Sequence, residues 1–190
     1  TWLSIPSSPR DAALGVTVSL SDRDASTALH NPAGLTTVNR PSIVLQRNVW
    51  ISDMHVTDLA VSYPLRPVGT LALTMRSMDY GVFEFTSPAA NESGYVDLDA
   101  SDAGDVGAYA IGLAFGRNLT DQLSIGIHGK YARENLGTVS GSAASVEQML
   151  LDLGTHYYSV ATGITLAALI SNAGATSTAT DGNASFAPPT

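Results

Sequence analysis

The sequence contains no cysteine, and Lys130 is its only lysine in 190 residues. The absence of cysteine excludes disulfides, thiolate zinc sites and cysteine nucleophiles. The shortage of lysine argues against the basic surface of a nucleic-acid-binding domain, so we expect no nucleic-acid partner. Charged residues make up 14% of the chain and the net charge is −8. A hydrophobic content of 44% excludes a disordered chain.

Long apolar runs are also missing. The longest, between residues 160 and 170, is interrupted by Thr162, Gly163 and Thr165. It is far shorter than the roughly 20 residues of a membrane-spanning helix. The start of the chain has neither the basic residues nor the apolar core of a signal peptide. The low charge and the strand pattern described below favour a processed chain over a cytosolic one.

Residues 1–40 differ from the rest of the chain. Short helical patches are predicted at 11–14 and 24–29, and the second ends before Asn31-Pro32 because the residue before a proline disfavours the helical region. Gly34 then permits a sharp turn. The segment is too short to form a core of its own.

From about residue 42 the hydrophobic pattern has a period of two. In 106–116, large apolar side chains alternate with alanine and glycine, which is typical of a β-strand with one apolar face. We expect seven strands in hairpin order, near 42–51, 55–63, 69–77, 106–116, 123–132, 148–158 and 159–170. Short turns (64–67, 117–122) alternate with long connections (79–104, 134–146).

Two all-β architectures fit this alternation. In a soluble antiparallel sandwich the apolar faces are buried against each other. In a transmembrane β-barrel they face lipid. The strand lengths, the alternating turns and the tyrosines near strand ends favour the barrel. A barrel predicts that one set of side chains points outward: Tyr109, Ile111, Leu113, Phe115, Leu123, Ile125 and Ile127.

Several short motifs follow one another along the chain. They are Ile5-Pro6, Arg10-Asp11-Ala12-Ala13-Leu14-Gly15, Asp24-Ala25-Ser26-Thr27, Asn31-Pro32-Ala33-Gly34-Leu35, Arg117-Asn118-Leu119-Thr120-Asp121-Gln122-Leu123-Ser124-Ile125-Gly126, Lys130-Tyr131, Leu136-Gly137, Asp152-Leu153-Gly154-Thr155-His156-Tyr157 and Ser171-Asn172-Ala173-Gly174. In this order they resemble the PorV/PorQ family of outer-membrane proteins, which belongs to the FadL-like β-barrel superfamily.

The resemblance implies an antiparallel transmembrane barrel of about 14 strands. Residues 1–40 would fold inward as a plug, fixed by the motif residues Asp24, Asn31, Pro32 and Gly34. Residues 41–190 would form the first half of the barrel. We expect the other strands to come from beyond residue 190 or from another chain, because an open sheet edge in lipid leaves backbone groups unpaired.

The resemblance also implies a location and a role. The location is the outer membrane of a Gram-negative bacterium, after removal of a signal peptide. The role is a non-enzymatic component of type IX protein secretion that docks or hands over exported proteins. The alternatives are a FadL-like channel for hydrophobic small molecules and a structural or surface-assembly protein. The expected partners are therefore outer-membrane lipid, proteins of a secretion or surface assembly and, for the uptake alternative, a hydrophobic ligand.

Six charged or ionisable side chains alternate with the apolar ones and should face the barrel interior, where they must pair. They are Asp58, Arg76, His128, Lys130, Asp152 and His156. A Ser–His–Asp arrangement with Ser124 is the competing hypothesis. The sequence contains no hydrolase, phosphate-loop or dinucleotide-binding motif, so we expect neither enzymatic activity nor a cofactor.

Residues 79–105 contain seven acidic residues and no lysine or arginine. We expect a solvated extracellular loop, which favours a docking surface for a protein partner. Asp97, Asp99 and Asp102 are candidate ligands for a divalent cation, although their spacing lacks the glycine and the later glutamate of an EF-hand.

Overall fold

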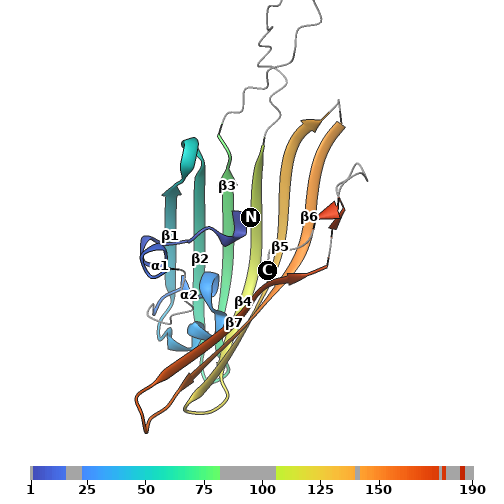
Figure 1. Ribbon diagram of the computed structural model, residues 1–190. Helices are drawn as coiled ribbons and strands as arrows, with labels where there is room; N and C mark the ends of the chain where they lie inside the picture. Colours follow the sequence, from blue (N-terminus) through green and yellow to red (C-terminus); the bar gives the residue numbers. More distant parts are fainter. Residues whose placement is uncertain are drawn as a thin grey trace, which may run out of the picture.

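The computed structural model describes residues 2–15, 23–81, 106–139, 142–175, 177–178 and 185–186. They form an all-β protein built on one antiparallel sheet (Figure 1). Its seven strands are β1 (Ser42–Val49), β2 (His55–Leu65), β3 (Gly69–Asp79), β4 (Gly107–Asn118), β5 (Leu123–Val139), β6 (Ser142–Tyr158) and β7 (Thr165–Gly174). A separate pair follows, β8 (Ser177–Thr178) and β9 (Ser185–Phe186). No helix among the described residues is long and apolar enough to cross a membrane.

Each strand of the large sheet pairs with the next one along the chain. The register places Arg76 opposite Asp58 on one side and Ala110 on the other. It likewise places His128 between Ala114 and Asp152. Charged residues far apart in sequence are thus brought to neighbouring positions by strand pairing alone. The sheet is open, since β1 and β7 each have one neighbouring strand in the described part of the chain.

The two faces of the sheet differ in composition and burial. The inner face, defined here as the one that carries the N-terminal segment, has small and polar side chains that are mostly buried. The outer face is apolar, and every strand contributes an exposed large or medium-sized side chain, for example Leu45, Tyr63, Leu73, Ile111, Ile127, Leu153 and Ile170. Alternate residues of a strand point to opposite faces, so the period of two produces this division.

The strand phase predicted from the sequence matches the structure. Of the seven side chains expected to point outward, five are exposed on the outer face. The other two, Phe115 and Leu123, are partly exposed there. The expectation of one sheet with an apolar face and a small-residue face is therefore confirmed.

The N-terminal segment (residues 2–15 and 23–40) contains four short helical elements. They are η1 (Trp2–Ser4), α1 (Pro9–Ala13), α2 (Thr27–His30) and η2 (Pro32–Thr37), and a further 3-10 turn, η3 (Ile51–Asp53), joins β1 to β2. Trp2 packs into a cluster with Val56, Met78 and Leu150 on the inner face. Leu35 anchors a second cluster that includes Ala72 and Ala114. The segment thus gives the inner face a partial second layer (Figure 1).

Two predicted element boundaries are wrong. The long connection expected at 134–146 is strand on both sides of residues 140 and 141, because β5 and β6 each run for 17 residues. A register shift between Asn135 and Thr138 lets the paired strands continue through this polar stretch. The strand expected at 159–170 begins only at Thr165, because Ser159 and Ile164 close a turn in which Gly163 has a φ of +68°.

Candidate functional site

Arg76 and Asp58 form a buried ion pair on the inner face. They are direct cross-strand neighbours on β3 and β2. Arg76 Nε donates to Asp58 Oδ1 at 2.7 Å, and Arg76 Nη2 donates to Asp58 Oδ2 at 3.0 Å. This two-point geometry matches the planar guanidinium to the carboxylate, which is the strongest arrangement of such a pair. Two of the six residues predicted from the sequence are thereby brought together.

The same guanidinium also holds the N-terminal segment. Its Nη1 donates to the carbonyl oxygens of Leu3 and Ile5, both at 3.0 Å, and its Nη2 donates to Ser7 Oγ at 2.6 Å. Asn48 of β1 adds bonds from Nδ2 to the carbonyls of Pro6 (3.0 Å) and Ser7 (2.8 Å). The start of the segment is therefore bound largely through its backbone carbonyls.

A second cluster joins β5, β6 and β7. His128 Nδ1 lies 3.1 Å from Asp152 Oδ2, and Lys130 Nζ lies 2.8 Å from the same oxygen. Lys130 also donates to Asn172 Oδ1 at 2.6 Å, and the Asn172 backbone N–H donates to Asp152 Oδ1 at 2.7 Å. Asn172 has a φ of +55° at the point where the β6–β7 register shifts. This register shift turns the Asn172 backbone N–H toward the Asp152 carboxylate.

The other ring nitrogen of His128 contacts Thr74. The distance from Thr74 Oγ1 to His128 Nε2 is 2.8 Å, and both side chains are buried. The chain of contacts is thus Thr74–His128–Asp152 and does not include Ser124. Ser124 Oγ instead donates to Asn118 Oδ1 at 2.7 Å. The Ser–His–Asp hypothesis is therefore not supported by the geometry.

His156 does not join this cluster. It lies on the inner face opposite Ser124 in the β5–β6 register and is partly exposed. Within the described residues it makes no hydrogen bond or ion pair to the other five members of the predicted network. The structure thus divides the six predicted residues into a pair, a triad and one separate histidine.

The predicted plug motif lies against a row of glycines. Gly116, Gly126 and Gly154 stand side by side on β4, β5 and β6, and this glycine row faces Asn31 and Pro32. A Cβ on Gly126 would collide with the backbone of Pro32 and Ala33, and one on Gly154 would collide with the Asn31 side chain. Only residues without a Cβ let the segment approach this closely.

The motif residues have distinct local roles. Asn31 is fully buried, accepts from Ala33 N at 3.0 Å and donates to the Thr155 carbonyl at 3.4 Å. Asp24 accepts from the backbone and hydroxyl of Ser26. Gly34 lies inside η2, where its N–H donates to the Asn31 carbonyl, so the expected sharp turn is a 3-10 helix that begins at Pro32.

Sequence reasoning missed several residues that complete these contacts: Ser7, Asn48, Thr74, Asn172 and the glycine row. Gly126, Gly154 and Asn172 lie inside the short motifs along the chain, which is a usable signal. Thr74 and Asn48 could be assigned to the inner face from the period of two. Their partners depend on strand register, which the pattern does not specify.

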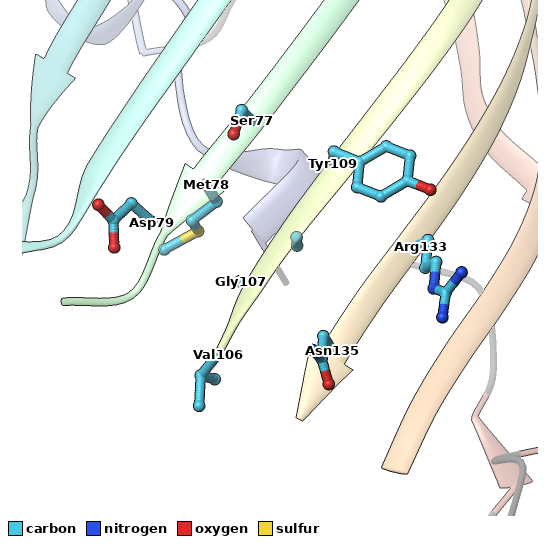
Figure 2. Close-up of a pocket in the computed structure, with 9 residues that line it drawn as sticks. Ser77, Met78, Asp79, Val106, Gly107, Tyr109, Arg133 and Asn135 are labelled. Atoms are coloured by element: carbon cyan, nitrogen blue, oxygen red, sulfur yellow. The ribbon is translucent and has the colours of Figure 1, made fainter. Parts of the chain in front are cut away.

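At the end of the sheet away from the glycine row, β3, β4 and β5 border a pocket of about 440 Å³ (Figure 2). Asp79 and Arg133 line it, and Arg133 lies 3.5 Å from Glu147 in an exposed pair. Just beyond β3, Tyr80 donates its hydroxyl to Glu134 at 2.5 Å. Burial and the adjacent carboxylate raise the pKa of this Tyr80 hydroxyl.

Most of the acidic stretch 79–105 lies outside the described residues, including the candidate cation ligands Asp97, Asp99 and Asp102. In the part of the chain that the structure describes, no group of three or more histidine or acidic side chains is placed to hold a metal ion.

These inner-face contacts can fix the N-terminal segment to the large sheet. The charges of Arg76 and Asp58, and those of Lys130 and Asp152, are paired with each other. Thr74 and His128 border a cavity of only about 30 Å³, which Leu3 and Leu29 also line. That volume holds about one water molecule. Comparisons with family models, curated proteins and solved structures gave no match to this chain.

Proposed function

We propose that this chain forms part of the wall of an outer-membrane β-barrel, with residues 1–40 as an interior plug, and that it resembles the PorV/PorQ family in serving protein export. The observation that carries the proposal is the difference between the two faces. Exposed apolar side chains extend over the outer face of all seven strands, while the inner face is polar and partly covered. Apolar-out and polar-in alternation is the pattern of strands that face lipid.

The N-terminal contacts support the plug. The segment is fixed at two separated places, by Arg76 and Asn48 near its start and by the glycine row near Asn31. Both places lie on the inner face, which a closed sheet would turn toward its lumen. A charged pair such as Arg76 and Asp58 is tolerated there because it is shielded from lipid.

The inner face favours protein docking over uptake of a hydrophobic molecule. Of the two cavities that Leu3 borders, the larger has a volume of about 160 Å³ and is lined in part by Arg76, Lys130 and Asp152. Ligand sites are typically about 300–1,000 Å³ and mostly apolar. The acidic stretch 79–105 is the proposed docking surface for exported proteins.

A non-enzymatic role is part of the proposal. Asp152 accepts from His128, Lys130 and the Asn172 backbone, so its oxygens are occupied. Thr74 and His128 are buried, and Leu3 and Leu29 line the small cavity beside them. A network that is saturated and covered is suited to holding strands and segment together.

The test compares the native chain with a variant in which Glu84, Glu92, Asp97, Asp99, Asp102 and Asp105 are replaced by Gln or Asn. Each protein is cross-linked in intact cells, purified from outer membranes, and analysed for bound proteins and extracted lipids. We expect a defined set of exported proteins that the neutralised variant loses. Recovery of fatty acids or hydrocarbons with no protein partner would contradict docking and favour uptake.

A further inference from the structure

The outer face changes character between two neighbouring rows of side chains. A row is defined here as the outward residues that strand pairing places opposite one another on β1 to β6. The apolar row contains five aliphatic side chains and a tyrosine: Leu45, Leu59, Met75, Ile111, Tyr131 and Met149. The polar row lies two residues away on each strand, and all its side chains carry a charge or a hydroxyl: Arg47, Thr57, Ser77, Tyr109, Arg133 and Glu147.

In the proposed barrel this change corresponds to a membrane surface. Lipid-facing bands of transmembrane barrels are bordered by aromatic side chains. Tyr109 and Tyr131 lie on the two sides of the change, with ring centroids 6.4 Å apart. The strands β5 and β6 continue beyond the polar row through a largely polar stretch. The lipid surface should therefore cross the strands between the two rows.

The pocket of about 440 Å³ lies on the polar side of this change (Figure 2). Gly107 occupies the row beyond the polar row, opposite Asp79 on β3 and Asn135 on β5, and its missing side chain leaves the outer face hollow there. Three side chains of the polar row also line the pocket: Ser77, Tyr109 and Arg133. Tyr109 and Ile111 are two residues apart on β4 and point to the same face, so the pocket adjoins the apolar row.

One side chain of each charge lines this pocket. Arg133 is 45% exposed and lies 3.5 Å from Glu147. Asp79 is exposed, and its Oδ1 accepts from the Gly81 backbone N–H at 2.9 Å. Asp79 is the direct cross-strand neighbour of Gly107 and Arg133 is a diagonal one, which places their Cβ positions about 5 Å and about 7–8 Å away. Both side chains are thus within reach of a group seated over Gly107.

A zwitterionic headgroup fits these charges. The guanidinium fork of Arg133 matches phosphate oxygens, and the Asp79 carboxylate can accept charge-assisted hydrogen bonds from an ammonium. A purely anionic headgroup would be repelled by Asp79. We propose that the pocket binds the phosphoethanolamine headgroup of a phospholipid whose acyl chains lie over the apolar row. The position of the chains rests on the proposed barrel, whereas the selection of the headgroup by charge does not.

The first experiment is calorimetric titration of the full chain in non-ionic detergent with dihexanoyl phosphatidylethanolamine or dihexanoyl phosphatidylglycerol. We expect Arg133→Gln to weaken binding of both lipids about threefold, the size of an exposed charged contact. Asp79→Asn should weaken only phosphatidylethanolamine, because only that headgroup carries an ammonium. Arg47→Gln is the matched control, since Arg47 is exposed in the same polar row and does not line the pocket.

The second experiment tests the position of the lipid surface without reference to the headgroup. Glu147→Cys and Met149→Cys place single cysteines in the polar and the apolar row of β6, in a chain without native cysteine. The vesicles are freeze-thawed with a membrane-impermeant maleimide, so that the reagent reaches both membrane surfaces. We expect labelling at position 147 and none at position 149.

The outcomes separate the site from the barrel. Weaker phosphatidylethanolamine binding in both pocket variants, with phosphatidylglycerol affected only by Arg133→Gln, supports the site. Binding that depends on Arg133 and is unchanged in Asp79→Asn overturns the selection of ethanolamine. Equal losses in Arg47→Gln, or no loss in either pocket variant, overturn the site. Equal labelling of positions 147 and 149 contradicts the barrel and the position of the acyl chains, while the titrations in detergent still decide the headgroup.

Discussion

At the scale of single residues, Arg76 has more hydrogen-bond partners than the sequence pattern predicts. It joins β3 to β2 through Asp58 and joins the sheet to the N-terminal segment through two carbonyls and a hydroxyl. A lysine has no planar fork and could not reproduce these directions together. Arg76 thus connects β2, β3 and the N-terminal segment on the inner face.

We expect Arg76→Ala to destabilise the protein by about 3–5 kcal/mol, because it leaves the Asp58 carboxylate buried without a partner. Urea unfolding of the full chain in detergent measures the loss. Arg133→Ala is the control, since Arg133 is 45% exposed and pairs loosely with Glu147. Its effect should stay within about 0.5 kcal/mol. Similar losses in the two variants would show that the Arg76 pair is not a buried one in solution.

The glycine row makes a second residue-scale prediction. Gly126→Ala places a methyl group against the Pro32 and Ala33 backbone, so we expect it to cost about 1–3 kcal/mol through overpacking. It should also expose the N-terminal segment to proteolysis. Gly129→Ala on the same strand is the matched control, because nothing lies within 4 Å of a Cβ there. Equal proteolysis of both variants would contradict docking of Asn31–Leu35 on this row.

At the scale of elements, β4 shows how much a period of two can specify. Between Ala108 and Gly116 its odd positions carry large apolar side chains and its even positions carry alanine and glycine. Leu113 is 56% exposed and Ala114 is fully buried, although they are adjacent. A shift of one residue would reverse every position of the strand.

The absence of native cysteine makes this phase measurable. A spin label on Leu113→Cys should be accessible to oxygen in lipid vesicles and shielded from a water-soluble relaxant. A label on Ala114→Cys should be shielded from both. Electron paramagnetic resonance power saturation gives the two accessibilities. If position 113 responds to the water-soluble relaxant as strongly as to oxygen, the outer face does not contact lipid.

The element scale also shows what the sequence could not specify. Hydrophobic alternation predicted the seven strands and the faces of Arg76 and His128. It failed at 134–146, where polar residues continue the strands, because polarity alone does not distinguish a loop from a strand that extends into water. Hydrogen-bond partners could not be predicted from alternation either. Whether His128 contacts Ser124 or Thr74 depends on the strand register, which is set by two strands together.

At the scale of the whole molecule, the N-terminal segment and the sheet depend on each other. The segment covers the charged inner face, and the glycine row and Arg76 give the segment its conformation. The outer face has no such cover among the described residues. Its exposed apolar side chains require another apolar phase, and lipid is the one that the proposed barrel provides.

The open edges lead to the last prediction. If the outer face lies in a membrane, unpaired N–H and C=O groups on β1 and β7 would each cost several kcal/mol, so both edges should be paired with further strands. We expect their amides to exchange hydrogen as slowly as those of β4 when the protein is measured in native membranes by exchange and mass spectrometry. The turn at 159–164 should exchange quickly and provides the internal control. Fast exchange confined to the β1 and β7 edges would mean that the sheet stays open and its edges meet water, which is incompatible with a closed barrel in lipid.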